Sequence, residues 1–357
     1  MSLLSNLSSQ GAVDGADARL ILLQDWLTSL NLVDPASARP ASADASFRRY
    51  FRVDVLAAQK AQRPELGDTL IVMDAPPERE NVPAFVKVDA LFAEAGVSVP
   101  VIVAQDIERG FLLLSDLGVS TYLQVLDHDN ASTMYAEALE SLVKIQKASQ
   151  PGVLPEFDRA FMLRELNLFP EWYIGKHLGA VLSEAQAAEL QKVFDAIIAN
   201  CLAQQQVFMH RDFHSRNLMW MDEGNPGILD FQDAVYGPIT YDVASLLRDA
   251  YISWDEEMVL DWAIRYWQHA KAEGLPVSPD IDSFYKDFEY MALQRHLKIL
   301  GIFCRLNYRD GKPLYLGDLP TVLDYVRKTA NRYKDLKPLV RLLDSLENKQ
   351  PQVGYTF

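Results

Sequence analysis

Hydrophobic and polar positions divide the chain into a strand-rich first third and a helix-rich remainder. In the first third, short apolar runs bounded by turn formers predict strands, and apolar residues three or four positions apart predict helices. An amphipathic helix is expected near 20–30, and a second helix is expected at 82–95, with Pro83 in its first turn and Gly96 as its stop. The strands are predicted at 47–55, 69–73, 99–104 and 110–114.

After Gly118 the apolar periodicity is almost entirely helical. The predicted helices cover 131–149, 158–177, 183–205, 240–251, 255–273 and 280–308, and two shorter pieces follow. A small sheet followed by a mainly helical region predicts an α+β fold with two domains. We place the first domain at 1–118 and the second at 119–357.

Strands are expected in the second domain only around the segment 210–217, whose sequence is HRDFHSRN. One apolar run, 207–209, enters this segment, and a second, 218–221, leaves it. A third run, 227–229, follows the turn formers at 222–226, so the second and third runs are predicted to form an antiparallel hairpin. A hairpin returns the chain to its starting point, so the residues just outside its two ends should lie side by side.

Those residues carry the groups that phosphoryl transfer requires. A carboxylate can orient and deprotonate an acceptor hydroxyl, while an amide oxygen and a second carboxylate can hold the Mg²⁺ that bridges nucleotide phosphates. Asp212, Asn217 and Asp230 supply these groups in that order. We predict a phosphotransferase with Asp212 as the catalytic base and with Asn217 and Asp230 as ligands of Mg²⁺, using ATP as co-substrate.

Composition and charge indicate which partners the protein can bind and in which compartment it works. The formal net charge of -15 argues against a nucleic-acid partner, and it favours solubility or, more weakly, a cationic substrate. The cysteines, Cys201 and Cys304, lie in helical patterns and are expected to be buried free thiols. No signal-peptide pattern or apolar stretch of ~18 residues is visible. We expect a cytoplasmic protein with no membrane association, as a monomer or weak dimer.

Several motifs resemble a known group of enzymes. The segment 210–217 followed by the Asp-Phe pair at 230–231 resembles the aminoglycoside phosphotransferase and choline kinase group. A closer resemblance, to bacterial cell-wall-recycling kinases, runs through 45–52 (ASFRRYFR), 72–78 (VMDAPPE) and 230–238 (DFQDAVYGP). Those kinases phosphorylate N-acetylmuramate and N-acetylglucosamine at the anomeric hydroxyl. The resemblance implies a bilobal protein-kinase-like fold, with a small β-rich N-lobe and a larger helical C-lobe.

The N-lobe departs from the wider kinase pattern in two places. The stretch 44–49, where kinases have a glycine-rich phosphate loop, has no glycine, and the strand at 69–74 has no lysine for the α- and β-phosphates. We expect Ser46 and one of Arg48 or Arg49 to contact the phosphates, with an arginine in place of the lysine. The alternative is that these arginines are surface charges.

The kinase-like resemblance also implies a position for the nucleotide base. The run 112–117 would supply backbone groups to adenine, which places Leu114, Asp116 and Leu117 at the nucleotide site. Periodicity alone predicts a buried strand over this run, and both interpretations can hold.

Acceptor recognition is predicted from proximity and from mixed aromatic and polar segments. Arg211 would orient the loop or contact an acidic substrate, and His210 is expected to be structural. Aromatic residues at helical spacing are alternatively part of the core. The candidate acceptor contacts are Arg211, His214, Asp233, Trp172, Arg248 and Tyr251.

The sequence therefore predicts an ATP- and Mg²⁺-dependent kinase, and the resemblance implies that its acceptor is a sugar hydroxyl, most specifically the anomeric hydroxyl of an N-acetylated amino sugar. An aminoglycoside or other amino-alcohol kinase would share every catalytic residue. A kinase-like nucleotide-binding protein without turnover is the third possibility, and the missing glycine loop and lysine support it.

Overall fold

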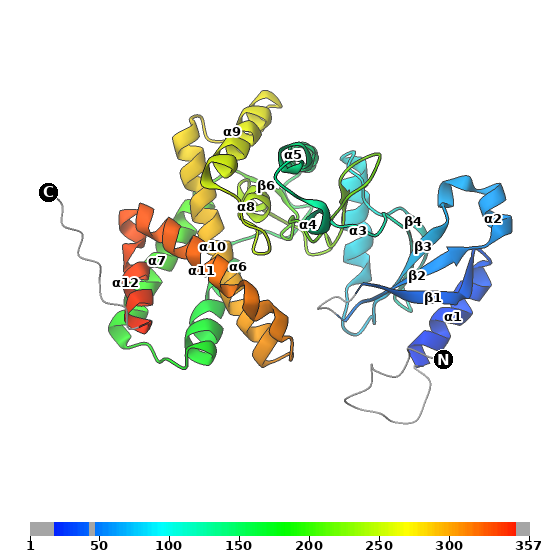
Figure 1. The fold of residues 1–357 in the computed structure, drawn as a ribbon, viewed down its shortest axis with the longest axis horizontal. Coiled ribbons are helices and arrows are strands. Elements are labelled where there is room, and N and C mark those ends of the chain that lie inside the picture. Colours follow the sequence, from blue (N-terminus) through cyan, green and yellow to red (C-terminus); the bar gives the residue numbers. More distant parts are fainter. Residues whose placement is uncertain (1–17, 43–46, 348–357) are drawn as a thin grey trace. The chain divides into compact units, whose positions relative to one another are not determined.

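The computed structural model describes residues 18–42 and 47–347, and the chain forms two compact units (Figure 1). Unit 1 comprises Met1–Ala84 and Pro100–Leu117, and unit 2 comprises Phe85–Val99 and Gly118–Phe357. The break after Leu117 lies next to the domain boundary proposed from the sequence. The segment Phe85–Val99, which the sequence analysis placed in the first domain, belongs to unit 2.

Unit 1 is built on an antiparallel five-stranded sheet with the strand order β1-β2-β3-β5-β4. The four strands predicted from apolar runs are present, as is the first helix. The elements are α1 Ala18–Leu30, β1 Val33–Ser42, β2 Arg49–Val55, α2 Ala57–Gln62, η1 Pro64–Leu66, β3 Thr69–Asp74, β4 Ile102–Asp106 and β5 Phe111–Ser115.

Strand β1 was not predicted, because its sequence contains Pro35 and Pro40 among polar residues. Proline cannot donate to a strand ladder, so it is tolerated mainly on an edge strand. β1 occupies the edge of the sheet, and its pairing with β2 has register shifts at Asp34/Arg39 and at Pro40/Ser42.

The core of unit 1 lies between α1 and the sheet. Leu23, Trp26 and Leu27 of α1 are buried against Val53, Leu70 and Phe111 of the strands. The rings of Trp26 and Phe111 have centroids 5.7 Å apart. Burying each such side chain stabilises the unit by roughly 1.5–3 kcal/mol, so α1 is an integral part of this sheet rather than an appendage.

Unit 2 is mainly helical, as predicted. Its helices are α3 Val82–Glu94 (assigned to this unit from Phe85), α4 Tyr122–Val125, α5 Ala131–Lys147, α6 Arg159–Leu166, the π-helix η2 Phe169–His177, α7 Glu184–Ala203, α8 Tyr241–Leu247, α9 Glu256–Ala272, α10 Ile281–Tyr308, η3 Pro313–Asp318, α11 Leu319–Arg332, η4 Lys334–Leu336 and α12 Lys337–Leu346.

The single helix predicted for 158–177 is divided into α6 and η2. Pro170 lies in the first turn of η2 and has no N–H to continue an α-helical ladder. Further along the chain, Gly301 of α10 approaches η2 so closely that a Cβ there would lie 2.4 Å from the Leu168 carbonyl. This close approach needs glycine, and it brings η2 onto α10.

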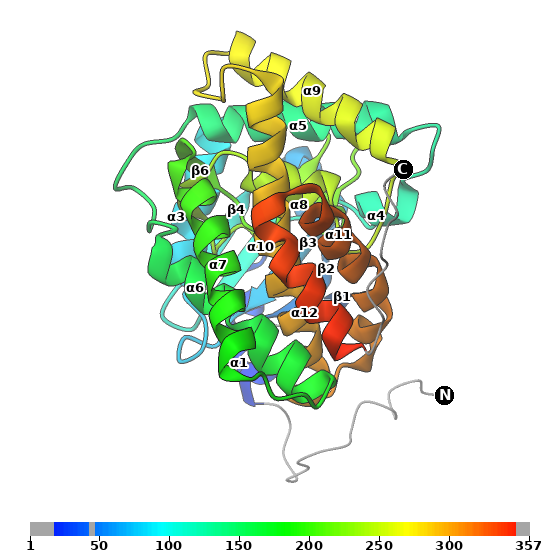
Figure 2. The same ribbon diagram turned by 90° about the vertical axis from the view of Figure 1, so that its left-hand side faces the viewer.

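Helix α10 is the centre of unit 2 and packs against α6, α7, α8, α9, α11, η2 and η3 (Figure 2). Every residue from Phe288 to Lys298 is buried, including the charged Arg295 and Lys298. Charged side chains are almost never buried without partners. These positions therefore indicate that α10 carries polar contacts as well as core packing.

Two small antiparallel sheets surround the segment 210–217. Strands β7 Leu218–Met219 and β8 Gly227–Ile228 form the predicted hairpin. Strand β6 Gln206–Met209 pairs with β9 Val235–Pro238, which was not predicted because a short VYGP run resembles a loop. Both cysteines are free and buried, as expected. Within the described ranges, no helix is long and apolar enough to cross a membrane.

Candidate active site

The loop 210–217 is anchored by its backbone to the first turn of α8. The N–H groups of His210 and Arg211 donate to the two carboxylate oxygens of Asp242, at 2.6 and 3.0 Å. Burial raises the pKa of Asp242 to about 7, and the two backbone donors act in the opposite direction. Because Asp242 is 1% exposed, it holds the start of the loop without competition from water.

The His210 ring ties the loop to the returning end of the hairpin. Its Nε2 lies 3.0 Å from the carbonyl oxygen of Leu229, and its Nδ1 lies 3.2 Å from the backbone N of Asp212. A carbonyl only accepts and an N–H only donates, so Nε2 carries the proton and Nδ1 accepts. Burial lowers the pKa of His210 to about 4, which keeps this neutral form at physiological pH. These hydrogen bonds are the loop-fixing contacts that the sequence predicted for His210.

The hairpin brings Asn217 and Asp230 together, as the sequence predicted. The Nδ2 of Asn217 donates to the carbonyl oxygen of Asp212 at 2.9 Å and lies 3.5 Å from Oδ2 of Asp230. The backbone N–H of Leu229 donates to the carbonyl oxygen of Asn217 at 2.9 Å, which closes the hairpin end. The Asn217 amide thus contacts the backbone of Asp212 and lies beside the Asp230 carboxylate.

Two residues of this site adopt left-handed backbone conformations. Arg211 has a φ of 79° and Asp230 a φ of 62°. A non-glycine residue in this region is disfavoured by roughly 1–2 kcal/mol, and such positions concentrate at functional sites. The Gln232 Nε2 donates to Oδ1 of Asp230 at 2.9 Å, which helps to hold the Asp230 carboxylate.

The Asp212 carboxylate is ionised. Burial alone would raise its pKa, but the charges of Lys298, His214, Arg211 and Arg295 outweigh burial and hold the pKa below its usual range. Burial also lowers the pKa of His214 from its ordinary value, which disfavours the charged form of this imidazole.

A buried ion network beneath the loop supplies this positive charge. Oε1 of Glu165 in α6 accepts from Arg211 at 2.9 Å and lies 3.1 Å from Nζ of Lys298, while Oε2 accepts from Gln294 at 3.0 Å. Arg295 donates to the carbonyl oxygen of Arg211 at 3.2 Å. This network was not predicted from the sequence. Its only signal is the run of polar residues inside the otherwise apolar middle of α10.

Asn217 and Asp230 fit a magnesium site by their donor chemistry. Mg²⁺ is a hard ion that proteins bind through one or two carboxylates, with phosphates and water completing the shell. The amide oxygen of Asn217 and the carboxylate of Asp230 are oxygen donors of this kind. Throughout residues 18–42 and 47–347, no cluster of three or more His, Cys, Asp or Glu side chains is positioned to hold a metal by itself.

Three predicted acceptor contacts lie in or beside the loop. The Arg211 guanidinium bonds to Glu165 and to the carbonyl oxygen of Asp233 at 3.3 Å, which supports its loop-orienting role. Asp233 is exposed. The His214 ring packs edge-on against Tyr251, with centroids 5.4 Å apart, and its buried Nδ1 has no hydrogen-bond partner among the described residues.

The remaining acceptor candidates separate into near and distant positions. Tyr251 lies directly against the loop through His214. Arg248 instead donates to Glu256 at 2.7 Å and lies 3.3 Å from the hydroxyl of Tyr285, with its side chain 7% exposed. It links α8 to α9 and α10. Trp172 is half-buried in η2.

The nucleotide candidates lie in unit 1, and most have protein partners. Arg49 bonds to Asp74 at 2.9 Å, and Arg48 lies 3.8 Å from Glu80. The predicted Ser46 lies outside the described residues. Leu114 is buried in β5, and Leu117 follows that strand. The Asp116 carboxylate accepts from two residues, Arg52 at 2.5 Å and Thr69 at 2.6 Å.

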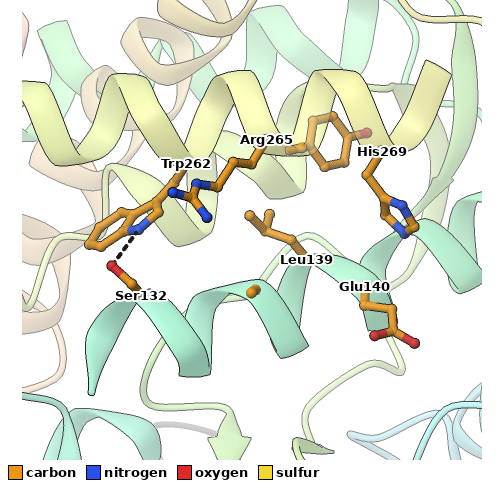
Figure 3. Close-up of a pocket in the computed structure, with 8 residues that line it drawn as sticks. Ser132, Leu139, Glu140, Trp262, Arg265 and His269 are labelled. Carbon is orange, nitrogen blue, oxygen red and sulfur yellow. Dashed lines mark hydrogen bonds between the residues drawn. The ribbon is translucent and has the colours of Figure 1, made fainter. Parts of the chain in front are cut away.

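A separate hollow of about 200 Å³ lies between α5 and α9 (Figure 3). Trp262 and His269 of α9 face Ser132 and Glu140 of α5 across it, and the Trp262 indole donates to Ser132 at 3.2 Å. None of the loop residues lines this hollow. It is therefore distinct from the site around Asp212.

The fold and the loop chemistry define a kinase-like phosphotransferase, and comparisons with solved structures agree on the fold. A choline kinase from Streptococcus pneumoniae, LicA, superposes with a TM-score of 0.60, covering 86% of this chain and 98% of the other at 12% identity. An ADP-bound aminoglycoside phosphotransferase, APH(2'')-Ib, superposes with a TM-score of 0.56, covering 87% and 98% at 13% identity.

Sequence comparison identifies the family. Residues 37–275 match the model of the phosphotransferase enzyme family, and the chain belongs to that family. It is 46% identical over 344 residues to the N-acetylmuramate/N-acetylglucosamine kinase of Neisseria meningitidis serogroup B, covering 95% of this chain and 99% of the relative. The kinase of the same name from Pseudomonas putida is 46% identical over 341 residues, covering 93% and 97%.

Proposed function

We propose that the protein is an ATP- and Mg²⁺-dependent kinase that phosphorylates the anomeric hydroxyl of N-acetylmuramate and N-acetylglucosamine. The observation that carries this proposal is the 46% identity, over nearly the full length of both chains, to kinases named for these two sugars. The site around Asp212, Asn217 and Asp230 supplies the chemistry that such a reaction needs.

In this mechanism the acceptor hydroxyl donates a hydrogen bond to Asp212, whose carboxylate is ionised and can only accept. Asn217 and Asp230 would hold Mg²⁺, which when bound neutralises phosphate charge. The anomeric oxygen forms a bond to the γ-phosphorus as the bond to the β-γ bridging oxygen breaks, and the hydroxyl proton passes to Asp212. Positioning and charge neutralisation provide most of the rate enhancement.

For the nucleotide, we propose that Arg48 or Arg49 takes the place of the missing strand lysine. Each lies next to a carboxylate that can hold the guanidinium in one orientation, Glu80 for Arg48 and Asp74 for Arg49. We further propose that the backbone around Leu114, Asp116 and Leu117 contacts the base.

For the acceptor, His214, Tyr251 and Asp233 are the proposed contacts, because His214 and Tyr251 pack together at the loop and Asp233 is exposed beside it. Arg211 is proposed to act through the loop, since its guanidinium bonds to Glu165. Use of ATP and of sugars recovered from the cell wall suits a cytoplasmic enzyme.

A product assay tests the proposed function. The protein is incubated with ATP and Mg²⁺ and, in separate reactions, with N-acetylmuramate, N-acetylglucosamine, aminoglycosides and choline-like amines, and products are followed by phosphorus NMR. We expect a sugar 1-phosphate from both amino sugars and no product from their methyl glycosides, in which the anomeric oxygen is blocked. A product with aminoglycosides or amines alone would contradict the proposal, and ADP formation in none of the reactions would favour a non-catalytic protein.

A further inference from the structure

The loop presents one cation that the catalytic scheme does not use. Arg216 immediately precedes Asn217, and its side chain is exposed. The guanidinium carbon lies 3.6 Å from the centroid of the Tyr251 ring and 5.8 Å from that of Tyr315. Within the described part of the chain, the Arg216 guanidinium makes no ion pair and no hydrogen bond, so its N–H groups remain available.

The aromatic surface under Arg216 is itself held in place. Tyr251 packs against His214 of the loop and against Phe303 of α10, with centroids 5.4 and 5.9 Å apart. Phe303 in turn packs against Tyr315 of η3, at 5.2 Å. We call Tyr251, Phe303 and Tyr315 the aromatic platform. Stacking on an aromatic face orients a guanidinium while leaving its N–H edges free for a planar anion.

The aromatic platform belongs to the neighbourhood of the catalytic carboxylate. The backbone N–H of His214 donates to the carbonyl oxygen of Asp212 at 3.1 Å, and His214 also contacts Tyr251. Burial raises the pKa of Tyr251. The charge of Arg216 lowers this pKa, and the charge of Asp212 raises it further. Arg216 also acts on Asp318, whose pKa burial raises, but the two groups do not form an ion pair. By geometry, Arg216 stacks on Tyr251, and Tyr251 contacts His214, which is two residues from Asp212.

The two amino sugars of the proposed function differ by one anionic group. N-acetylmuramate is N-acetylglucosamine with a lactyl ether on O3, and this ether ends in a carboxylate. Guanidinium groups bind carboxylates through two parallel N–H···O bonds, which are stronger than bonds between neutral groups. We propose that Arg216, stacked on Tyr251, binds the lactyl carboxylate of N-acetylmuramate and thereby sets the preference for the acidic over the neutral sugar. This inference rests on the proposed function and deepens it.

The test compares kcat/KM for both sugars in wild type and in Arg216→Met, which keeps a chain that can cover the platform but removes the charge and the donors. Loss of a charged, paired hydrogen bond should lower kcat/KM for N-acetylmuramate by roughly 10- to 100-fold. The value for N-acetylglucosamine should stay within about twofold, since that sugar offers no carboxylate. Arg216→Lys should lie between, because it keeps charge without the planar fork.

Changing the substrate as well as the protein tests whether Arg216 contacts the lactyl carboxylate itself. The methyl ester of the lactyl group removes the carboxylate charge, so wild type should lose about the same factor on the ester as Arg216→Met loses on the acid. Arg216→Met should lose nothing further on the ester, because the same interaction is already absent. Arg309→Met is the matched control. Arg309 is an exposed arginine just after the end of α10 that bonds to Asp310 at 2.7 Å, and its replacement should leave kcat/KM for both sugars unaffected.

The outcomes separate this inference from the proposed function. Equal losses for both sugars would overturn it, since a contact to the nucleotide or a structural role affects every acceptor alike. An unchanged ratio in Arg216→Met, with 1-phosphates formed from both sugars by wild type, would overturn the role of Arg216 alone. Formation of neither 1-phosphate by wild type would overturn the proposed function and this inference together.

Discussion

The positive charges around Asp212 lower its pKa by more than burial raises it. Lys298, Arg211 and Arg295 hold its pKa low, so the carboxylate is a weak proton acceptor in the unliganded protein. A weak base contributes chiefly by orienting the acceptor hydroxyl, with proton transfer late in the reaction. The approach of an anionic nucleotide would offset part of the positive charge and make Asp212 a better base when the substrate is in place.

Replacing Asp212 by Asn should expose this role. An amide has nearly the same shape but cannot take a proton, so turnover is expected to fall by at least ~10²-fold. Nucleotide affinity and the fold should be retained, although thermal stability should fall because the carboxylate charge that Lys298, Arg211 and Arg295 stabilise is lost. Asp261→Asn, at an exposed ion pair of α9, is the charge-matched control. Near-normal turnover in Asp212→Asn would remove Asp212 from the mechanism.

At the scale of elements, α10 connects the helical core to the loop. Its residues Gln294, Arg295 and Lys298 reach Glu165 of α6 and the backbone of Arg211. Breaking a buried ion pair is costly because the remaining charge stays desolvated, whereas removing both partners avoids that cost. Helix α10 thus supports the loop geometry and the charge around Asp212 through one set of contacts.

The coupling between Glu165 and Lys298 can be measured by a double-mutant cycle. Glu165→Gln and Lys298→Met should each lower the free energy of unfolding in urea. The double variant should be less destabilised than the sum of the singles, by about 1–3 kcal/mol. Asp324→Asn and Lys328→Met, an exposed pair on α11, serve as the control cycle and should be nearly additive. Additive costs at Glu165 and Lys298 would show that they do not act as a pair.

The local pattern of apolar residues and turn formers predicted most helices and strands, but it did not predict the contacts between distant ones. The hairpin between β7 and β8 was predictable because turn formers and apolar runs are adjacent in sequence, and it placed Asn217 beside Asp230. The network at Glu165 was not, because its partners Gln294 and Lys298 are more than a hundred residues away. Strands β1 and β9 were missed for a related reason, since proline and glycine in them disguise pairing that long-range contacts provide.

At the scale of the whole molecule, net charge is a poor guide to the acceptor. Acidic residues outnumber basic ones by 49 to 34, which on its own favours solubility or a cationic substrate. Near the loop, Arg211, Arg295 and Lys298 act on Asp212 despite this acidic excess, and Arg216 is exposed on the loop four residues further along the chain. Individual cations such as these, rather than the net charge, are the groups that can pair with an anionic nucleotide or an acidic sugar.

Binding of ATP with Mg²⁺ should stabilise the whole molecule against heat. A ligand at 100 times its Kd adds about 2.7 kcal/mol to the free energy of unfolding, which raises Tm by several degrees. Since Asp230 is the carboxylate proposed to hold the metal, Asp230→Asn should remove the part of this shift that EDTA removes from wild type. The measurement is a thermal melt with ATP alone, ATP with Mg²⁺, and ATP with EDTA.

Asp261→Asn again serves as the control and should keep the full magnesium-dependent shift, because Asp261 lies in an exposed pair on α9. The comparison does not depend on which acceptor the enzyme uses, so it tests the metal site separately from the sugar. A full magnesium-dependent shift in Asp230→Asn would show that the metal is held elsewhere. Loss of that shift, with stability unchanged in the absence of ligand, would assign Asp230 to the metal rather than to the fold.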